Sequence, residues 1–428
     1  MDEARLRWLF LDLNSYFASV EQQENPRLRG RPVIVRPAPT EHTCAIAAST
    51  EAKAFGIRTG TMVAEARRLC PGLVVVEARH DVYVEYHHRI VAEIERHLHV
   101  TRVMSIDEVA CELLGRERLT ANALTLAHEV QAGVQTNVGE CLRSSVGLAP
   151  SVLLAKTASD MKKPGGLTVL GAHELPGPLL SLTLRDFSGI GRNMAKRLEA
   201  SGIADVAALW ALTPGRARAV WGSIMGERFC YGLHGIDPPD LPEKPPQSFG
   251  HSHVLGGALR NHDAAYRVGR RLLARAASRL RRAGFRAGGL SLYLRLADGP
   301  SRDGALRLEP SADTFRFLRA YDELWRGVTG GGRMIRPLHV GVTLFDIRTA
   351  AETPDLFGWA EAANDNPKSL RLSAALDRLN QRYGSETVAI GGPGRKACRA
   401  TWAPRSPSTG FRPWTIFAAR RAAGARTG

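Results

Sequence analysis

Two short segments combine acidic residues with apolar runs that are typical of buried β-strands. An apolar run over residues 8–11 leads into Asp12, and a second, largely apolar run over residues 103–106 leads into Asp107 and Glu108. A carboxylate at the end of a buried strand is costly unless a cation or a basic partner compensates for it. Three such carboxylates on neighbouring strands suit Mg²⁺, which prefers oxygen ligands and shares them with substrate phosphates. Two such ions would stabilise the attacking and leaving oxygens of an in-line phosphoryl displacement.

The neighbouring motifs decide how these segments are interpreted, because adjacent acidic residues alone are usually solvated loop residues. The first segment continues as DLNSYFASVE over 12–21, and the second reads SIDE over 105–108. A third motif follows, with SVGLAP over 145–150 and LAKTASDMKKPGGL over 154–167. In order and spacing these motifs resemble those of the Y family, or translesion family, of DNA polymerases. The similarity is closest to the branch of bacterial DNA polymerase IV and UmuC-like proteins.

The resemblance covers roughly residues 8–350, with a weaker similarity to about residue 392. It implies a multidomain α/β and α+β fold arranged as a right hand. The implied parts are a palm (1–25 and 80–170), fingers (26–79), a thumb with a helix-hairpin-helix (171–236), a linker (237–247), a little finger domain (248–349), a C-terminal segment (350–392) and a disordered basic tail (393–428).

The resemblance also implies the activity and the residues that perform it. The chain would be a template-directed DNA polymerase that adds deoxynucleotides to a primer 3′ end during damage tolerance. Asp12, Asp107 and Glu108, with the carbonyl of Leu13, would hold two Mg²⁺ ions. Phe17 matches the family's steric gate, a ring that packs under the sugar and excludes a 2′-hydroxyl.

Further nucleotide contacts are expected from Lys163, which matches a lysine that binds the triphosphate, and from Tyr16. The fingers depart from the family at this point. The usual Tyr-Glu-Ala-Arg stretch is replaced by residues 50–53, so Thr50 and Lys53 stand where a Tyr and an Arg bind the triphosphate. Lys53 keeps the charge but lacks the bidentate guanidinium of Arg. Asn14 stands where many relatives have Asp. We therefore expect weak nucleotide binding or dependence on a partner.

Contacts with primer-template DNA are expected in two places. A Gly-x-Gly turn at Gly189 and Gly191 precedes a predicted helix, whose N-terminal N–H groups can bind a phosphate without reading sequence. A predicted helix over residues 263–282 carries a stripe of arginines four residues apart, within a stretch from 264 to 297 that contains no acidic residue. The DNA-binding candidates on this stripe are Arg267, Arg271 and Arg275.

A short peptide near the C-terminus suggests a further partner. Residues 352–357 end in Asp355, Leu356 and Phe357 and resemble the sliding-clamp-binding peptide of bacterial polymerases, although Thr353 replaces the usual Gln. The alternative is an apolar anchor that packs on the body of the protein.

Composition limits the class of protein. The 428 residues carry a net charge of +16, which favours a polyanionic partner, although about half of this charge lies in residues 395–428. No membrane span or signal peptide is expected. Six scattered cysteines without a CxxC pair argue against a zinc site and fit a reducing cytosol. We expect a cytoplasmic monomer.

Periodicity predicts the elements that position these residues. Strands are expected over 7–12, 74–76, 103–111 and 143–148 in the first half of the chain, and over 290–296 and 338–345 in the second. Helices are expected over 16–23, 45–55, 62–69, 83–97, 121–138 and 152–161, the last opened by Ser151.

Three other functions remain open at this point. One is a non-catalytic or partner-dependent polymerase-like subunit of a mutagenesis complex, which the fingers substitutions favour and the three carboxylates oppose. Another is a two-metal nuclease, which acidic clusters alone would allow and which Phe17 and Lys163 oppose. The last is a basic nucleic-acid-binding protein without catalytic activity.

Overall fold

The computed structural model describes residues 6–41, 43–242, 245–330, 335–349, 366–384, 387–388 and 390. The chain divides into two compact units, and one boundary between them falls between Leu241 and Pro242. Among the described residues, the first unit contains two sheets and three hydrophobic clusters, and the second unit contains one sheet and one cluster.

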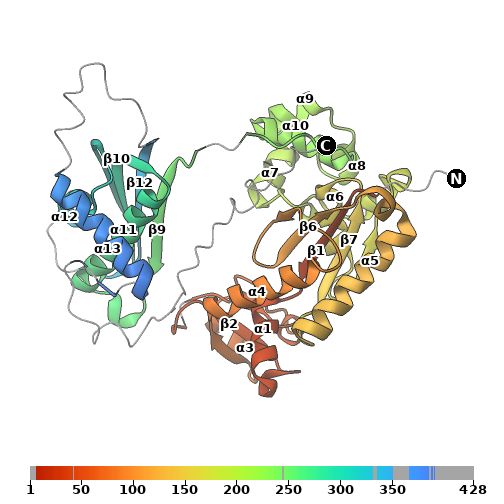
Figure 1. The fold of residues 1–428 in the computed structure, drawn as a ribbon, viewed down its shortest axis with the longest axis horizontal. Coiled ribbons are helices and arrows are strands. Elements are labelled where there is room, and N and C mark those ends of the chain that lie inside the picture. The colour runs from red at the N-terminus through yellow and green to blue at the C-terminus, as the bar shows by residue number, and fades with distance from the viewer. Residues whose placement is uncertain are drawn as a thin grey trace, which may run out of the picture. The chain divides into compact units, whose positions relative to one another are not determined.

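The first unit is built on a five-stranded sheet with the order β5-β6-β1-β7-β8 (Figure 1). Its central strand pairs antiparallel with both neighbours, and only the pair β7 and β8 is parallel. The strands are β1 (Trp8–Leu13), β5 (Arg102–Val103), β6 (Glu108–Glu112), β7 (Ser144–Ala149) and β8 (Leu167–Val169).

Both faces of β1 are buried, because side chains alternate between two cores. Leu9 and Leu11 point into one core, which also contains side chains of α4 (His80–Ile94) and α5 (Thr120–Gly133). Trp8 and Phe10 point into the opposite core, which contains side chains of α6 (Val152–Met161). The predicted buried strand is therefore confirmed, and its C-terminal end lies between two helical layers.

Smaller elements complete the first unit. A three-stranded sheet consists of β2 (Val33–Arg36), β3 (Ala47–Ala48) and β4 (Val74–Glu77). The remaining helices are α1 (Tyr16–Glu24), α2 (Thr50–Ala54), α3 (Val63–Leu69), α7 (Arg192–Ala200), α8 (Val206–Trp210), α9 (Pro214–Trp221) and α10 (Ile224–Leu233).

The first residues after α10 are tied to the first unit. The Asp237 carboxylate accepts the N–H of Val152 at 3.3 Å, at the start of α6. Asp240 pairs with Arg102 at 3.1 Å. These contacts keep the beginning of the Pro-rich stretch 237–247 on the body of this unit.

The second unit is a four-stranded antiparallel sheet with helices packed on it. The order is β11-β10-β12-β9, formed by β9 (Ser248–Val254), β10 (Phe285–Leu296), β11 (Arg302–Ser311) and β12 (Pro337–Thr349). Two long helices, α11 (His262–Arg282) and α12 (Thr314–Thr329), share the core of this unit with the sheet.

A third helix of this unit, α13 (Pro367–Tyr383), is attached through polar contacts. The carboxylate of Asp313, which caps α12, accepts the hydroxyls of Ser369 at 2.7 Å and Ser373 at 3.3 Å. Arg281 of α11 donates to Asp377 at 2.8 and 3.0 Å. Since Asp313 and Ser373 are each 1% exposed, this junction is part of the interior of the unit.

Two predicted elements differ from the structure. The predicted helix over 45–55 is wrong in its first half, because Ala47 and Ala48 pair with β2 and the helix begins only after Ser49, which accepts the N–H of Ala52. Strand pairing there overrides the helix propensity of alanine. The predicted single strand over 103–111 is a hairpin, since Met104 and Ser105 both donate to the carbonyl of Glu108. No described helix is long and apolar enough to cross a membrane.

Candidate active site

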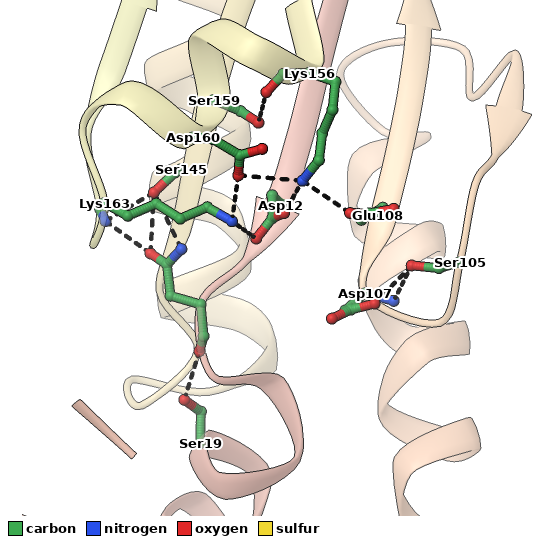
Figure 2. A network of polar contacts seen from close by, with 12 residues as sticks. Asp12, Ser19, Ser105, Asp107, Glu108, Ser145, Lys156, Ser159, Asp160 and Lys163 are labelled. Carbon is green, nitrogen blue, oxygen red and sulfur yellow. Dashed lines mark hydrogen bonds and ion pairs between the residues drawn. The ribbon is translucent and has the colours of Figure 1, made fainter. Parts of the chain in front are cut away.

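The two carboxylates Asp12 and Glu108 are direct neighbours across the sheet. They are cross-strand partners in the antiparallel pair of β1 and β6, which places their side chains on the same face. That face is covered by α6, and the ammonium of Lys156 reaches both carboxylates from this helix, at 2.5 Å from Asp12 and 2.8 Å from Glu108 (Figure 2). One cationic centre is therefore shared by oxygens of two strands.

A second lysine balances the same cluster. Lys163 lies 2.7 Å from the other oxygen of Asp12 and 2.6 Å from Asp160 of α6. Asp160 also lies 3.2 Å from Lys156. Although burial alone would lower it, the pKa of Lys156 is raised above its ordinary value by the neighbouring Asp12, Glu108 and Asp160 carboxylates. The two ammonium groups therefore balance the negative charge of the Asp12, Glu108 and Asp160 carboxylates.

Asp107 lies in the turn between β5 and β6. Its carboxylate accepts the hydroxyl of Ser105 at 2.6 Å, and its backbone carbonyl accepts the N–H of Leu13 at 2.9 Å. Burial raises the pKa of Asp107 above its ordinary value, and the charge of Asp12 adds to this rise. The structure thus brings all three predicted carboxylates to the ends of β1 and β6.

Oxygen donors of this kind fit a hard divalent cation. The side-chain oxygens of Asp12 and Glu108 already converge on one positive charge, and Asp107 is close enough to Asp12 for their charges to interact. In the described part of the chain, no group of three His, Cys, Asp or Glu side chains is arranged to hold a metal ion, and the Lys156 ammonium lies between Asp12 and Glu108. Because the acidic side chains of this cluster are all carboxylates, their oxygens would suit Mg²⁺ better than zinc once the lysine gives way.

The ring of Phe17 lies on a support of aromatic side chains. It stacks on Tyr83 with ring centroids 4.4 Å apart, and the ring of His80 meets it edge-on at 6.4 Å. The Tyr83 hydroxyl donates to Glu21 at 2.7 Å, and Arg79 forms a bidentate ion pair with the same carboxylate. The ring of Phe17 is therefore held in position by Tyr83, which is itself hydrogen-bonded to the Glu21 carboxylate.

Tyr16, which the sequence suggests as a nucleotide contact, has its side chain in the core. It is 3% exposed, and its hydroxyl donates to the carbonyl of Tyr83 at 2.6 Å. Ser15, which precedes it, has a φ of 54° and turns the chain from β1 into α1. Any nucleotide contact of Tyr16 must therefore come from its backbone at the start of α1.

The predicted basic residues converge on the carboxylates from two elements. Burial lowers the pKa of Lys53, and the charge of Lys163 lowers it further, while Asp12 opposes this effect. Lys53 of α2 and Lys163 therefore lie close enough to interact. Thr50, the first residue of α2, is exposed.

The loop that carries Lys163 is held by Asn14. The N–H of Gly165 donates to Asn14 Oδ1 at 2.7 Å, and the Asn14 amide lies 3.1 Å from the Ser145 hydroxyl. Asn14 is 6% exposed, so this network is internal. Asn14 therefore connects the ends of β1 and β7 to the loop that carries Lys163.

The predicted DNA-binding residues are divided between the two units. In the first unit, Gly189 and Gly191 are exposed before α7, and Gly189 has a φ of 94°, which favours glycine. In the second unit, Arg267 is exposed on α11, while Arg271 and Arg275 are half-buried near His253 of β9. The proposed clamp peptide, Asp355 to Phe357, and the tail over 393–428 lie outside the described residues.

Not every residue of this cluster could be identified from the sequence. Asp160 was missed, and Lys156 was only a weaker candidate than Lys163 for the triphosphate contact, or for a structural role, although Lys156 and Asp160 lie on one face of α6 with a spacing of four residues. The aromatic support formed by Tyr83 and His80 was also missed, because neither residue belongs to a quoted motif.

Comparisons with known proteins place the chain in a family. A model described as the impB/mucB/samB family matches residues 11–160, and the model of its C-terminal domain matches residues 246–356. DNA polymerase IV of Moorella thermoacetica is 34% identical over 397 residues, which cover 89% of this chain and 94% of the relative. The chain belongs to the Y family of DNA polymerases. It is a DNA-directed DNA polymerase of the translesion type.

Other comparisons agree with this assignment. DNA polymerase IV 1 of Bacillus subtilis is 30% identical over 388 residues, covering 89% of this polymerase and 91% of the relative. The solved structure of a Y-family polymerase chimera of Dbh and Dpo4 has a TM-score of 0.66 at 21% identity and covers 80% of this chain and 99% of its own, which confirms the fold. A domain of unknown function matches residues 370–408 and includes most of α13.

Proposed function

We propose that Asp12, Asp107 and Glu108, with the carbonyl of Leu13, hold two Mg²⁺ ions at the ends of β1 and β6. The observation that carries this proposal is the cross-strand pair of Asp12 and Glu108 around one shared cation. Bound Mg²⁺ would make the primer 3′-hydroxyl a better nucleophile and stabilise charge on the triphosphate. The protein's own part is to hold the carboxylates in register and to supply basic side chains around them.

The incoming deoxynucleotide would lie between the carboxylates and the fingers. Lys163 and Lys53 would bind the triphosphate. The negative charge of the triphosphate would then take the place of the Asp12 carboxylate, with which both lysines interact in this structure. Thr50 and the backbone at Tyr16 would add weaker contacts. Phe17, fixed on Tyr83, would face the sugar and exclude ribonucleotides.

The remaining parts of the chain would bind primer-template DNA. In this proposal residues 1–25 and 80–170 form the palm, 26–79 the fingers and 171–236 the thumb, with Gly189 and Gly191 at a phosphate. Residues 248–349 form the little finger, whose Arg267, Arg271 and Arg275 contribute positive charge. A sliding clamp is proposed as a partner of residues 352–357, and the polymerase is proposed to act as a monomer.

The test is primer extension on a primed template with Mg²⁺ and the four deoxynucleotides. The Asp107→Ala/Glu108→Ala double variant should lose extension while fluorescence anisotropy shows DNA binding within about twofold of the wild type. Extension by both proteins at similar rates would overturn the metal-site assignment.

The same assay also tests whether a partner is required. The fingers residues Thr50 and Lys53 favour a site that binds nucleotides weakly by itself. If neither protein extends the primer although both bind DNA, addition of a sliding clamp should restore extension to the wild type alone.

A further inference from the structure

The turn that carries Asp107 and Glu108 has a carbonyl group at its tip that the hairpin itself does not use. We call residues 104–108 the carboxylate turn. Within it, Met104 and Ser105 donate to the carbonyl of Glu108 at 2.9 and 3.2 Å, and Leu13 of β1 donates to the carbonyl of Asp107. Ile106 lies between these bonds. A partly buried carbonyl of this kind needs a hydrogen-bond donor from elsewhere in the fold.

His87 of α4 supplies that donor. Its Nδ1 lies 2.8 Å from the carbonyl oxygen of Ile106. Because a carbonyl oxygen can only accept, Nδ1 must carry the hydrogen in this bond. The His87 side chain is 4% exposed and therefore cannot move away from the turn without disturbing the core around α4.

The same face of α4 supports the nucleotide side of the site. Tyr83 lies four residues before His87, so the two side chains are neighbours on the helix. Tyr83 stacks on Phe17, and its hydroxyl is bound to Glu21. One rigid helix thus contacts both the ring proposed to lie under the sugar and the turn that presents two proposed metal ligands.

We propose that His87 is a positioning residue, which fixes the carboxylate turn through the carbonyl of Ile106 so that Asp107 and Glu108 face Asp12. This inference rests on the proposed metal-binding role of these carboxylates. It assigns His87 an effect on metal affinity, not a contact with substrate. A histidine that only filled the core would affect stability without a specific effect on the metal site.

Matched substitutions separate these two roles. Asn places an amide N–H close to the position of Nδ1, whereas the amide of Gln lies one bond further out. His87→Asn should therefore keep the bond to Ile106, while His87→Gln and His87→Leu should lose it. Both amide variants bury a polar group of similar chemistry, so a difference between them reports on the geometry of the donor.

The first measurement is Mn²⁺ affinity by electron paramagnetic resonance on the full chain with primer-template DNA. Loss of outer hydrogen-bond partners of metal ligands commonly weakens affinity about 10- to 100-fold. We expect roughly tenfold weaker Mn²⁺ binding for His87→Gln and His87→Leu, and a change below about twofold for His87→Asn. Amide exchange at residues 104–108 should accelerate in the same two variants, and the Mg²⁺ concentration for half-maximal extension should rise in parallel.

Equal Mn²⁺ affinity and equal amide exchange in His87→Asn and His87→Gln would overturn the role of His87, whether or not His87→Leu folds. The Asp107→Ala/Glu108→Ala variant keeps this failure distinct from failure of the proposed function. If that variant retains Mn²⁺ binding, the metal-site assignment is wrong. If it loses Mn²⁺ binding while every His87 variant keeps it, only the inference about His87 is wrong.

Discussion

The ammonium of Lys156 lies 2.5 Å from a carboxylate oxygen of Asp12, on the face of the sheet that α6 covers. Both side chains are largely buried, with 14% and 8% of their surfaces exposed. In the absence of metal this lysine keeps Asp12 and Glu108 from repelling each other. Removal of the Lys156 ammonium should therefore reduce the stability of the fold most when no divalent ion is present.

Lys156→Met should lower the free energy of unfolding by about 1–2 kcal/mol in the presence of a chelator, less than for a fully buried pair because Lys163 remains beside Asp12. The difference from the wild type should shrink as Mg²⁺ is added. Thermal unfolding with chelator and with Mg²⁺ measures both effects. Lys162→Met, at an exposed neighbouring position, is the control. A loss that stays the same in Mg²⁺ would contradict this interpretation.

Phe17→Ala should admit ribonucleotides, because the ring on Tyr83 would no longer occupy the space proposed for the 2′-hydroxyl. The ratio of kcat/KM for ribonucleotides over deoxynucleotides should rise by at least about tenfold, which single-nucleotide incorporation measures. Phe55→Ala is the control, since Phe55 is half exposed after α2. An unchanged ratio in Phe17→Ala would rule out the assignment of Phe17 as the gate.

The Thr50→Tyr/Lys53→Arg double variant should bind deoxynucleotides more tightly. A guanidinium can bind the triphosphate with two hydrogen bonds, where the Lys53 ammonium acts as a point charge. KM for the incoming nucleotide should fall about fivefold, and Lys53→Met should raise it. Steady-state incorporation with each variant provides the comparison. Equal KM values for the double variant and the wild type would show that the fingers substitutions do not limit affinity.

Arg281→Gln should destabilise the second unit. Arg281 is 13% exposed on its side chain and donates to Asp377, to the carbonyl of Ala312 and to the hydroxyl of Thr314. Loss of these bonds should cost about 2 kcal/mol, which hydrogen exchange of peptides from β10 and β12 would report in the full chain. Arg282→Gln, at the exposed neighbouring position, is the control. Similar exchange in both variants would mean that α13 adds little to the core.

The second unit should also lose stability as the pH falls. Burial, and then the charges of Arg279 and Arg275, lower the pKa of His251 to about 4. Between that value and an ordinary pKa near 6.5, the unfolded chain binds a proton that the folded chain does not, so stability rises with pH through this window and is lost on acidification.

At pH near 5 the loss from His251 should be on the order of 1 kcal/mol, after allowance for partial exposure. This loss of stability is measured by hydrogen exchange of β9 and β12 peptides at neutral and acidic pH, corrected for intrinsic exchange rates. His251→Gln should show a smaller loss than the wild type. His173→Gln, at an exposed position of the first unit, is the control and should leave the loss of stability on acidification unchanged. A full loss in His251→Gln would refute the assignment.

Local patterns were sufficient where the sequence and the tertiary structure favour the same element. The apolar run over 8–11, Ser151 before α6 and the arginines spaced four residues apart over 263–282 predicted elements that the structure contains. The ordered motifs also predicted that Asp12, Asp107 and Glu108 would come together. The cross-strand pairing of Asp12 with Glu108, and the bond from Leu13 N–H to the Asp107 carbonyl, supply the geometry.

Residues whose partners are remote in sequence could not be found in this way. His87 and the carbonyl of Ile106 belong to different elements, and nothing in the sequence near either one indicates the bond. Likewise, the alanine-rich stretch 45–48 gave no sign that β2 would recruit two of its residues into a sheet. In both cases packing between distant segments determines the outcome.

The attachment of α13 has a consequence for inherited variation in this chain. The C-terminal family match ends at residue 356, yet the serines that satisfy the buried Asp313 carboxylate follow at 369 and 373. A premature stop codon between these points would spare every residue proposed for catalysis and still remove both serine hydroxyls from the Asp313 carboxylate, which would keep the N–H of Phe315 and lose the cover of α13. Such an allele would reduce the amount of folded polymerase in the cell, and its phenotype would be that of low abundance instead of altered chemistry.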